Sequence, residues 1–144
     1  MTTRAEWETL LDRLAVDELI NGYGAAVDDG DWTSYVALLT PDGRADYTSA
    51  GGVAGPATEV ADWLASTMRP FPVRQQLIVN RRIAFEPPSA VARADYVKPM
   101  RLDDPGTKAT APDFVSGGRY TFGLRHTGAG WRIQGVLGRE KWRS

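Results

Sequence analysis

Asp28 is the residue whose type and position most clearly suggest chemistry. It lies between Tyr23 and Trp32, where an amphipathic helix is expected to stop at Gly30. A carboxylate at a helix C-terminus faces the negative end of the helix dipole, which disfavours its ionised form. An acid placed there, beside aromatic and apolar residues, is typical of a general acid or base. The alternative is a carboxylate solvated at the helix end.

Lys98 is a second group that could do chemistry. A strand is expected over residues 90–100, and its apolar alternate positions mark the inward face. Because a buried lysine costs free energy unless it is paired, we expect Lys98 either to reach water at a pocket mouth or to meet an acid such as Asp28. The inward set is Ala92, Ala94, Tyr96, Lys98 and Met100, and the outward set includes Arg93 and Asp95.

Hydroxyl and amide groups complete the set that acid–base chemistry could use. Tyr47 could donate a hydrogen bond to an oxygen that gains negative charge, and Gln76 could orient that oxygen or a water. Each candidate also has a structural interpretation, such as a core aromatic for a tyrosine or a loop-securing side chain for Asn80. The predicted catalytic residues are Asp28, Tyr47 and Gln76, and the predicted substrate-binding residues are Tyr23, Trp63, Asn80, Tyr96, Lys98, Met100, Tyr120 and Phe122.

Composition excludes several other classes of chemistry. The chain has 144 residues, a net charge of −1, no cysteine and one histidine. Disulfides, thiolate metal sites and cysteine nucleophiles are therefore excluded, and a cytoplasmic protein is favoured. His126 precedes a turn and has no partner at a metal-ligand spacing, so we expect no metal and no organic cofactor. Scattered positive charge and short apolar runs favour neither nucleic acid nor a membrane as partner.

The elements that must position these groups are helical first and extended later. Apolar spacing predicts helices from Trp7 to Gly30, from Trp32 to about Leu39, and from Gly55-Pro56 to Met68. A turn is expected at residues 40–43, with a short strand at 45–48. Longer strands are expected over residues 73–85, 90–100, 114–125 and 131–139. Alternation places Tyr120, Phe122 and Leu124 on one face, and Trp131, Ile133, Gly135 and Leu137 on one face. This order indicates a single α+β domain over residues 1–144.

Several motifs together resemble a known family. They are the pattern from Leu19-Ile20 through Asp28 and Gly30-Asp31-Trp32 to Tyr35, then Leu39–Gly43, Asp46-Tyr47, Gly55, Asn80, Gly117–Tyr120 and Gly130–Ile133. In these the chain is similar to the SnoaL-like family of the nuclear transport factor 2-like superfamily. The resemblance implies a cone-shaped α+β fold, with a curved, mostly antiparallel sheet capped by N-terminal helices around a deep apolar pocket.

The resemblance also bears on the site. In the scytalone dehydratase branch an aspartate after the first helix, a tyrosine on the first strand and two histidines serve a water-mediated elimination. Asp28 and Tyr47 match the first two, whereas Gln76 and Met100 stand where the histidines would be. Glutamine cannot shuttle a proton. The spacing of Arg93 and Asp95 is similar to that of limonene-type epoxide hydrolases, but alternation places both outward, as an exposed cross-strand charge pair.

Three functions follow as hypotheses. The first is a cofactor-independent dehydratase, isomerase or cyclase that acts on a small apolar, oxygenated molecule such as a polyketide, aromatic or steroid-like compound. The second is a non-catalytic small-molecule-binding or assembly domain, and the third is an epoxide hydrolase. Because Leu77-Ile78-Val79 is apolar on both faces, we expect a homodimer, or else a trimer, through the convex side of the sheet.

Overall fold

The computed structural model describes residues 1–106, 108 and 110–144. The helices are α1 (Arg4–Asp29), α2 (Trp32–Ala37), the short 3-10 helix η1 (Thr48–Ala50) and α3 (Ala57–Thr67). The strands are β1 (Leu39–Asp46), β2 (Ala54–Pro56), β3 (Val73–Arg74), β4 (Leu77–Glu86), β5 (Ser89–Arg101), β6 (Phe114–Thr127) and β7 (Gly130–Arg143).

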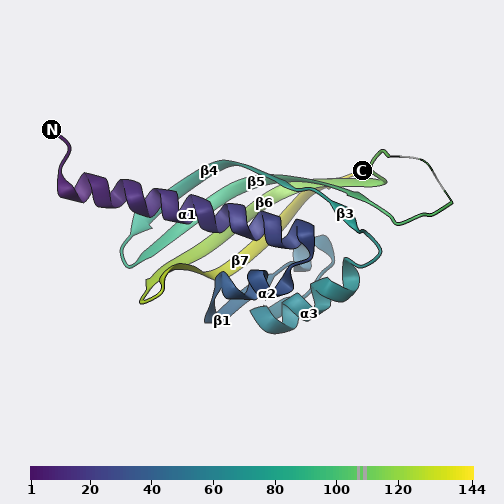
Figure 1. Cartoon of the computed structure of the whole chain (residues 1–144), viewed down its shortest axis with the longest axis horizontal. Coiled ribbons are helices and arrows are strands. Elements are labelled where there is room, and N and C mark those ends of the chain that lie inside the picture. The colour runs from purple at the N-terminus through teal and green to yellow at the C-terminus, as the bar shows by residue number, and fades with distance from the viewer. Residues whose placement is uncertain (107, 109) are drawn as a thin grey trace.

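All of these strands belong to one curled sheet. Its order is β2-β1-β7-β6-β5-β3, with β4 paired to β5. Neighbouring strands are antiparallel except β1 and β7, which run parallel. Figure 1 shows α1 lying across the sheet, with α2 and α3 gathered beside its C-terminal half. The predicted cone-shaped α+β fold is confirmed.

Helix α1 supplies the main cover of the inner face. Thr3 and Glu6 form a reciprocal capping box at its start, and Gly30 ends it in the left-handed conformation, with φ 66°. The second half of the helix buries Val16, Leu19, Ile20, Tyr23, Gly24, Ala26 and Val27. Its first turns extend past the sheet (Figure 1). Trp7, Leu10, Leu11 and Leu14 stay exposed despite their helical spacing.

Three predicted boundaries need correction. The strand expected over residues 73–85 is two strands, β3 and β4, interrupted at residues 75–76. The turn expected at residues 40–43 lies inside β1, which pairs with β7 through a register shift between Leu39 and Arg44. Proline 56 precedes the first residue of α3 instead of occupying it. No helix among the described residues is both long and apolar enough to cross a membrane.

Two bulges in β7 overturn its predicted alternation. The partner of Gly123 is Gly135 but that of Leu124 is Ile133, so Gln134 is an extra residue. Beyond it Val136 and Gly138 are buried, in place of the predicted Gly135 and Leu137. A second shift makes Lys141 extra. These shifts decide which C-terminal side chains meet the inner face.

The outer face of β4 carries exposed apolar side chains. Leu77 is 53% exposed and Val79 is 44% exposed. Between them, Ile78 points inward and lies 3.3 Å from where a Cβ would stand on Gly24 of α1. The pattern fits a strand that needs cover on both sides, and the homodimer through this face remains a prediction.

Candidate active site

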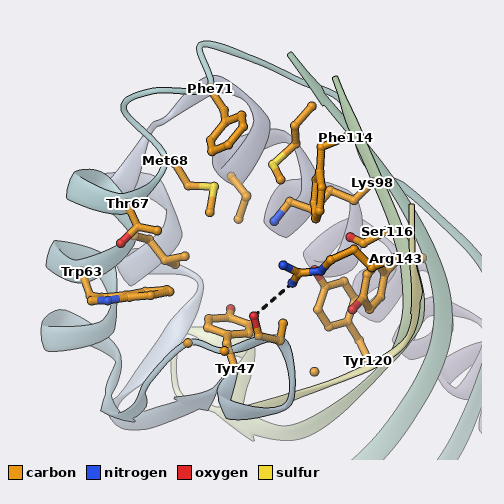
Figure 2. A pocket seen from close by; sticks show the side chains of 18 of the residues that line it. Tyr47, Trp63, Thr67, Met68, Phe71, Lys98, Phe114, Ser116, Tyr120 and Arg143 are labelled. Atoms are coloured by element: carbon orange, nitrogen blue, oxygen red, sulfur yellow. Dashed lines mark hydrogen bonds between the residues drawn. The ribbon is translucent and has the colours of Figure 1, made fainter. Parts of the chain in front are cut away.

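A cavity of about 240 Å³ occupies one end of the inner face. It lies between the C-terminal part of α1, helix α3, η1 and strands β5, β6 and β7 (Figure 2). Apolar side chains dominate its wall on the α3 side, where Trp63, Leu64, Met68 and Phe71 stand. The polar groups of the wall are hydroxyls, one amine and one guanidinium, a combination suited to a small, largely apolar ligand that carries oxygen.

Three tyrosine hydroxyls meet at one side of the cavity. The Tyr47 hydroxyl lies 2.6 Å from that of Tyr23 and 2.8 Å from that of Tyr35. Tyr23 and Tyr47 line the cavity, whereas Tyr35 is fully buried. Burial raises the pKa of Tyr23 and of Tyr47 well above the ordinary value, and it raises the pKa of Tyr35 to about 12. All three therefore stay protonated at neutral pH.

Asp28 lies at the end of α1, behind the cavity wall. Both of its carboxylate oxygens accept a hydrogen bond from the backbone N–H of Gln76, at 3.1 Å each. Burial raises the pKa of Asp28, and the Gln76 N–H, Lys98 and Arg74 act in the opposite direction. The break between β3 and β4 thus presents a backbone donor to the carboxylate. The predicted proton-transfer role of Asp28 remains a prediction.

Gln76 is buried beside the cavity, with 7% of its surface exposed. Its Oε1 accepts a hydrogen bond of 2.9 Å from the hydroxyl of Tyr120, which lines the cavity. Its Nε2 is buried and has no hydrogen-bond partner within the described part of the chain. Gln76 therefore contacts the cavity wall through the hydrogen bond of its side chain with Tyr120, and it contacts Asp28 through its backbone N–H.

Lys98 projects into the cavity, as the alternation along β5 predicts. Figure 2 shows its side chain running from the sheet so that the amine ends inside the cavity, near Phe114. Among the described residues the amine has no hydrogen bond and no carboxylate within 4.0 Å, so the pairing with Asp28 is electrostatic and not a contact. Burial, aided by Arg74, lowers the pKa of Lys98 to about 8, against the attraction of Asp28.

The structure brings most of the predicted substrate-binding residues together. Those that line the cavity are Tyr23, Trp63, Tyr96, Lys98, Met100 and Tyr120. Phe122 instead packs in the core, fully buried against Tyr23 at a ring distance of 5.2 Å.

Asn80 is a correction to the predicted set. It lies exposed on β4, where its amide donates to Asp95. Its φ of 54° falls at the register shift of that strand, and asparagine tolerates this conformation better than most residues. Its place in the sequence pattern therefore reflects backbone geometry and not ligand contact.

The residues behind the epoxide-hydrolase hypothesis lie on the outer face. Arg93 is exposed, and Asp95 pairs with Arg119 across the strand at 2.9 Å, so the predicted charge pair exists with a different arginine. The geometry that epoxide hydrolysis would need, with Arg93 and Asp95 facing the cavity, is absent from the described residues. Glu140 pairs with Arg143 at 2.7 Å, and His126 is exposed at the end of β6.

Sequence reasoning missed several residues of the cavity wall. Ser116 and Phe114 continue the alternation of Tyr120 along β6, so that signal could have found them. Arg143 had no such signal, because only the bulge at Lys141 pairs it with Ser116 on the inner face. Its guanidinium lies 4.8 Å from the centre of the Phe114 ring and donates to the carbonyl of Ala50, as Figure 2 shows. Thr67 and Phe71 complete the wall.

Known proteins resemble this chain in sequence and in fold. A family model described as SnoaL-like domain matches residues 8–136. An uncharacterized protein of Mycobacterium tuberculosis is 28% identical over 89 residues, which is 62% of this chain. The match spans only 60% of the length of that relative.

Two solved structures share the fold. One is a provisionally named scytalone dehydratase of Novosphingobium aromaticivorans, with a TM-score of 0.80, 17% identity and coverage of 94% of this chain and 88% of that one. The other is a hexachlorocyclohexane dehydrochlorinase of type 2, with a TM-score of 0.76, 18% identity and coverage of 93% and 90%. At these identities the likeness establishes the fold alone.

Proposed function

The chain belongs to the SnoaL-like family of the nuclear transport factor 2-like superfamily, and from that premise we propose that it is a cofactor-independent enzyme. The proposed reaction is an elimination, an isomerisation or a ring closure on a small apolar molecule that carries oxygen. The observation that carries this proposal is the enclosed cavity, into which the hydroxyl of Tyr47 is held by two other tyrosines. A preorganised donor in a largely apolar cavity is suited to stabilising an oxygen that gains negative charge.

A count of the hydroxyl protons shows how many hydrogen-bond donors the tyrosine cluster has beyond its own hydrogen bonds. Each hydroxyl carries one proton, and the two hydrogen bonds among Tyr23, Tyr35 and Tyr47 use two of the three. One O–H is therefore left over, and it is donated either by Tyr23 to Tyr120, with which Tyr23 has a side-chain hydrogen bond, or into the cavity that Tyr23 and Tyr47 line. The raised pKa values keep the cluster protonated, so it acts as a hydrogen-bond donor and not as a base.

Proton transfer is assigned to Asp28. Asp28 is the carboxylate whose charge acts on Lys98, and burial raises its pKa toward the range of a general base. A substrate whose oxygen lies at Tyr47 would present its reacting carbon toward Lys98. Asp28 lies behind the wall, so a proton would reach it through a bridging group such as a water. The volume of the cavity is enough for a molecule of one or two rings, which favours an aromatic or polyketide compound over a full steroid nucleus.

The names of the structural neighbours support the same reaction type. One is named for the removal of water and the other for the removal of hydrogen chloride. Both are eliminations, in which a C–H proton leaves and a neighbouring group departs. Within the proposal we therefore rank elimination ahead of isomerisation and ring closure.

Tyr47→Phe tests the proposal directly. We expect a panel of hydroxylated aromatic ketones, followed by absorbance and mass spectrometry, to reveal a compound that loses water or rearranges. On that compound Tyr47→Phe should reduce kcat about 10²-fold, in line with the loss of one donor to a developing oxyanion. Asn80→Gly on the outer face is the control, because glycine adopts the left-handed backbone at that position, and it should keep wild-type turnover. Wild-type kcat in Tyr47→Phe would contradict the proposal.

A second candidate is a binding protein without catalysis. It is favoured by the position of Asp28 behind the wall and by Gln76 and Met100, neither of which can transfer a proton. Compounds from the same panel would then bind with no chemical change, and Tyr47→Phe would weaken the affinity alone.

A further inference from the structure

Lys98 differs from every other charged side chain of the cavity in having no partner. Arg143 is paired with Glu140 and hydrogen-bonded to the carbonyl of Ala50. The Lys98 amine, by contrast, makes no hydrogen bond or ion pair with any residue that the structure describes. Lys98 is partly buried, and an unpaired ammonium that is partly removed from water costs free energy. The proton chemistry above gives no reason for its presence in the wall.

The surroundings of the amine favour its neutral form. Met100 and Phe114 line the wall with Lys98, and Figure 2 shows Phe114 next to its side chain. The charged groups that act on it are Arg74 from β3, which disfavours the ammonium, and Asp28 from α1, which favours it. Desolvation is the largest effect and brings the pKa of Lys98 to about 8. A lysine that is desolvated in an apolar pocket near another cation is an activated amine nucleophile.

We propose that Lys98 forms an imine with the carbonyl carbon of an aldehyde or ketone bound in the cavity. In this step the amine nitrogen forms a bond to the carbonyl carbon, and the carbonyl oxygen leaves as water with the two amine protons. The imine takes up a proton to become a cation, which the nearby charge of Asp28 stabilises. A C–H bond next to that cation is more acidic than one next to the parent carbonyl, so the imine would assist the elimination proposed above.

This inference rests on the proposed function and narrows its substrate class to small carbonyl compounds. It also explains why a hydroxyl donor and an amine occupy one cavity. The amine engages the carbonyl carbon, and the tyrosine hydroxyls bind a second oxygen of the same molecule. Such a molecule would be a carbonyl compound that also carries a hydroxyl group or a second carbonyl group.

The chain offers a clean test because it has only three lysines, at positions 98, 108 and 141. At pH 7.5 a lysine with pKa about 8 has roughly a quarter of its amine neutral, against about 0.1% for an ordinary lysine. Full-length protein would be treated with benzaldehyde and sodium cyanoborohydride, which reduces an imine to a stable benzylamine. Peptide mass mapping would then locate the adduct. We expect at least tenfold more label on Lys98 than on Lys141.

Controls distinguish labelling of an amine in the cavity from the ordinary reactivity of exposed amines. The N-terminal amine of the exposed Met1 serves as an internal reference. Benzyl alcohol has the same ring but no carbonyl, and it should protect Lys98 without protecting that amine. Lys98→Arg and Lys98→Met should abolish the cavity adduct, and Lys141→Arg should leave it unchanged. Label spread evenly over the lysines, or confined to the N-terminus, would overturn the proposal.

The outcomes also separate this inference from the proposed function. If Tyr47→Phe reduces turnover but Lys98 takes no label, the imine is wrong and the acid–base enzyme stands. If Lys98 takes the label and no panel compound is turned over, the reactive amine stands and the proposed enzyme is contradicted.

Discussion

The two ends of the sheet's inner face are built from the same two strands, β5 and β6, and have opposite properties. At one end β5 and β6 present Ala92, Phe122 and Leu124, which are fully or almost fully buried beneath α1. At the other end the same strands present Tyr96, Lys98 and Ser116 to a cavity. The first end is a packed core, and the second is a binding site with polar groups on apolar walls.

This difference shows that one strand can contribute to the packed core at one end and to a binding site at the other. Small and purely apolar side chains let α1 approach the sheet at the packed end. Toward the C-terminal end of α1 the aromatic side chains carry hydroxyls, and the hydroxyls form a connected cluster instead of filling the space. Stability should therefore depend on the first end and turnover on the second.

The largest expected effect comes from breaking the packed end. Phe122→Ala removes a fully buried ring and should lower the free energy of unfolding by about 3–5 kcal/mol, as such core truncations do. Phe114→Ala, the matched change at the cavity end, removes a partly exposed ring and should cost about 1 kcal/mol or less. Chemical denaturation of both variants measures the contrast, and equal losses would show that the cavity end is also core.

Asp28→Asn should reduce turnover, which depends on the cavity end, and should leave stability unchanged. It keeps the shape of the side chain and removes its titration, so kcat should fall by about 10²–10⁴-fold if Asp28 transfers the proton. The pH profile of kcat should also lose one limb, while ligand affinity and melting temperature change little. Turnover close to wild type would assign the proton transfer to another group, with Lys98 the next to test.

Lys98→Met should stabilise the protein at neutral pH. The pKa of Lys98 is about 8 in the folded state and about 10.4 when unfolded. Between these values the unfolded chain binds more protons, so the stability of the wild type rises with pH over this range. The variant lacks that rise. It should exceed the wild type by up to about 3 kcal/mol below pH 8, and the gap should close above about pH 10.5. A gap that is independent of pH would show that the amine is not desolvated.

The link between Gln76 and Tyr120 should give the smallest effect. Gln76→Ala leaves the buried Tyr120 hydroxyl without its acceptor, which should cost about 1–3 kcal/mol of stability. Tyr120→Phe removes the donor, and the double variant should then cost about 1 kcal/mol less than the two single changes added together. Additive costs would indicate that the hydrogen bond contributes little to the cavity wall.

How far the sequence alone predicts this molecule depends on whether a residue's position is set locally. Helix ends marked by Gly30 and Asp31, and the alternation of β5 that turns Lys98 inward, depend on neighbours in the chain and were predicted correctly. The bulges of β7 and the left-handed Asn80 depend on partners on other strands. Those long-range features put Arg143 into the wall, took Asn80 out of it, and could not be inferred from spacing.

The bulge at Gln134 has a consequence for how such proteins change over time. Because it shifts the strand by one residue, Gly138 and not Leu137 lies beneath Tyr47 and Tyr120, 3.3 Å from the Tyr47 ring at the position where a Cβ would stand. Deleting Gln134 would remove the bulge yet keep Gly135 opposite Gly123 and Gly138 opposite Tyr120, whereas one residue added between Gly135 and Leu137 would bring the Leu137 side chain onto the cavity floor. The interior volume is thus set by the length of a strand as much as by the identity of the lining. One codon added at that point would therefore fill the chamber without replacing any residue that faces the cavity today.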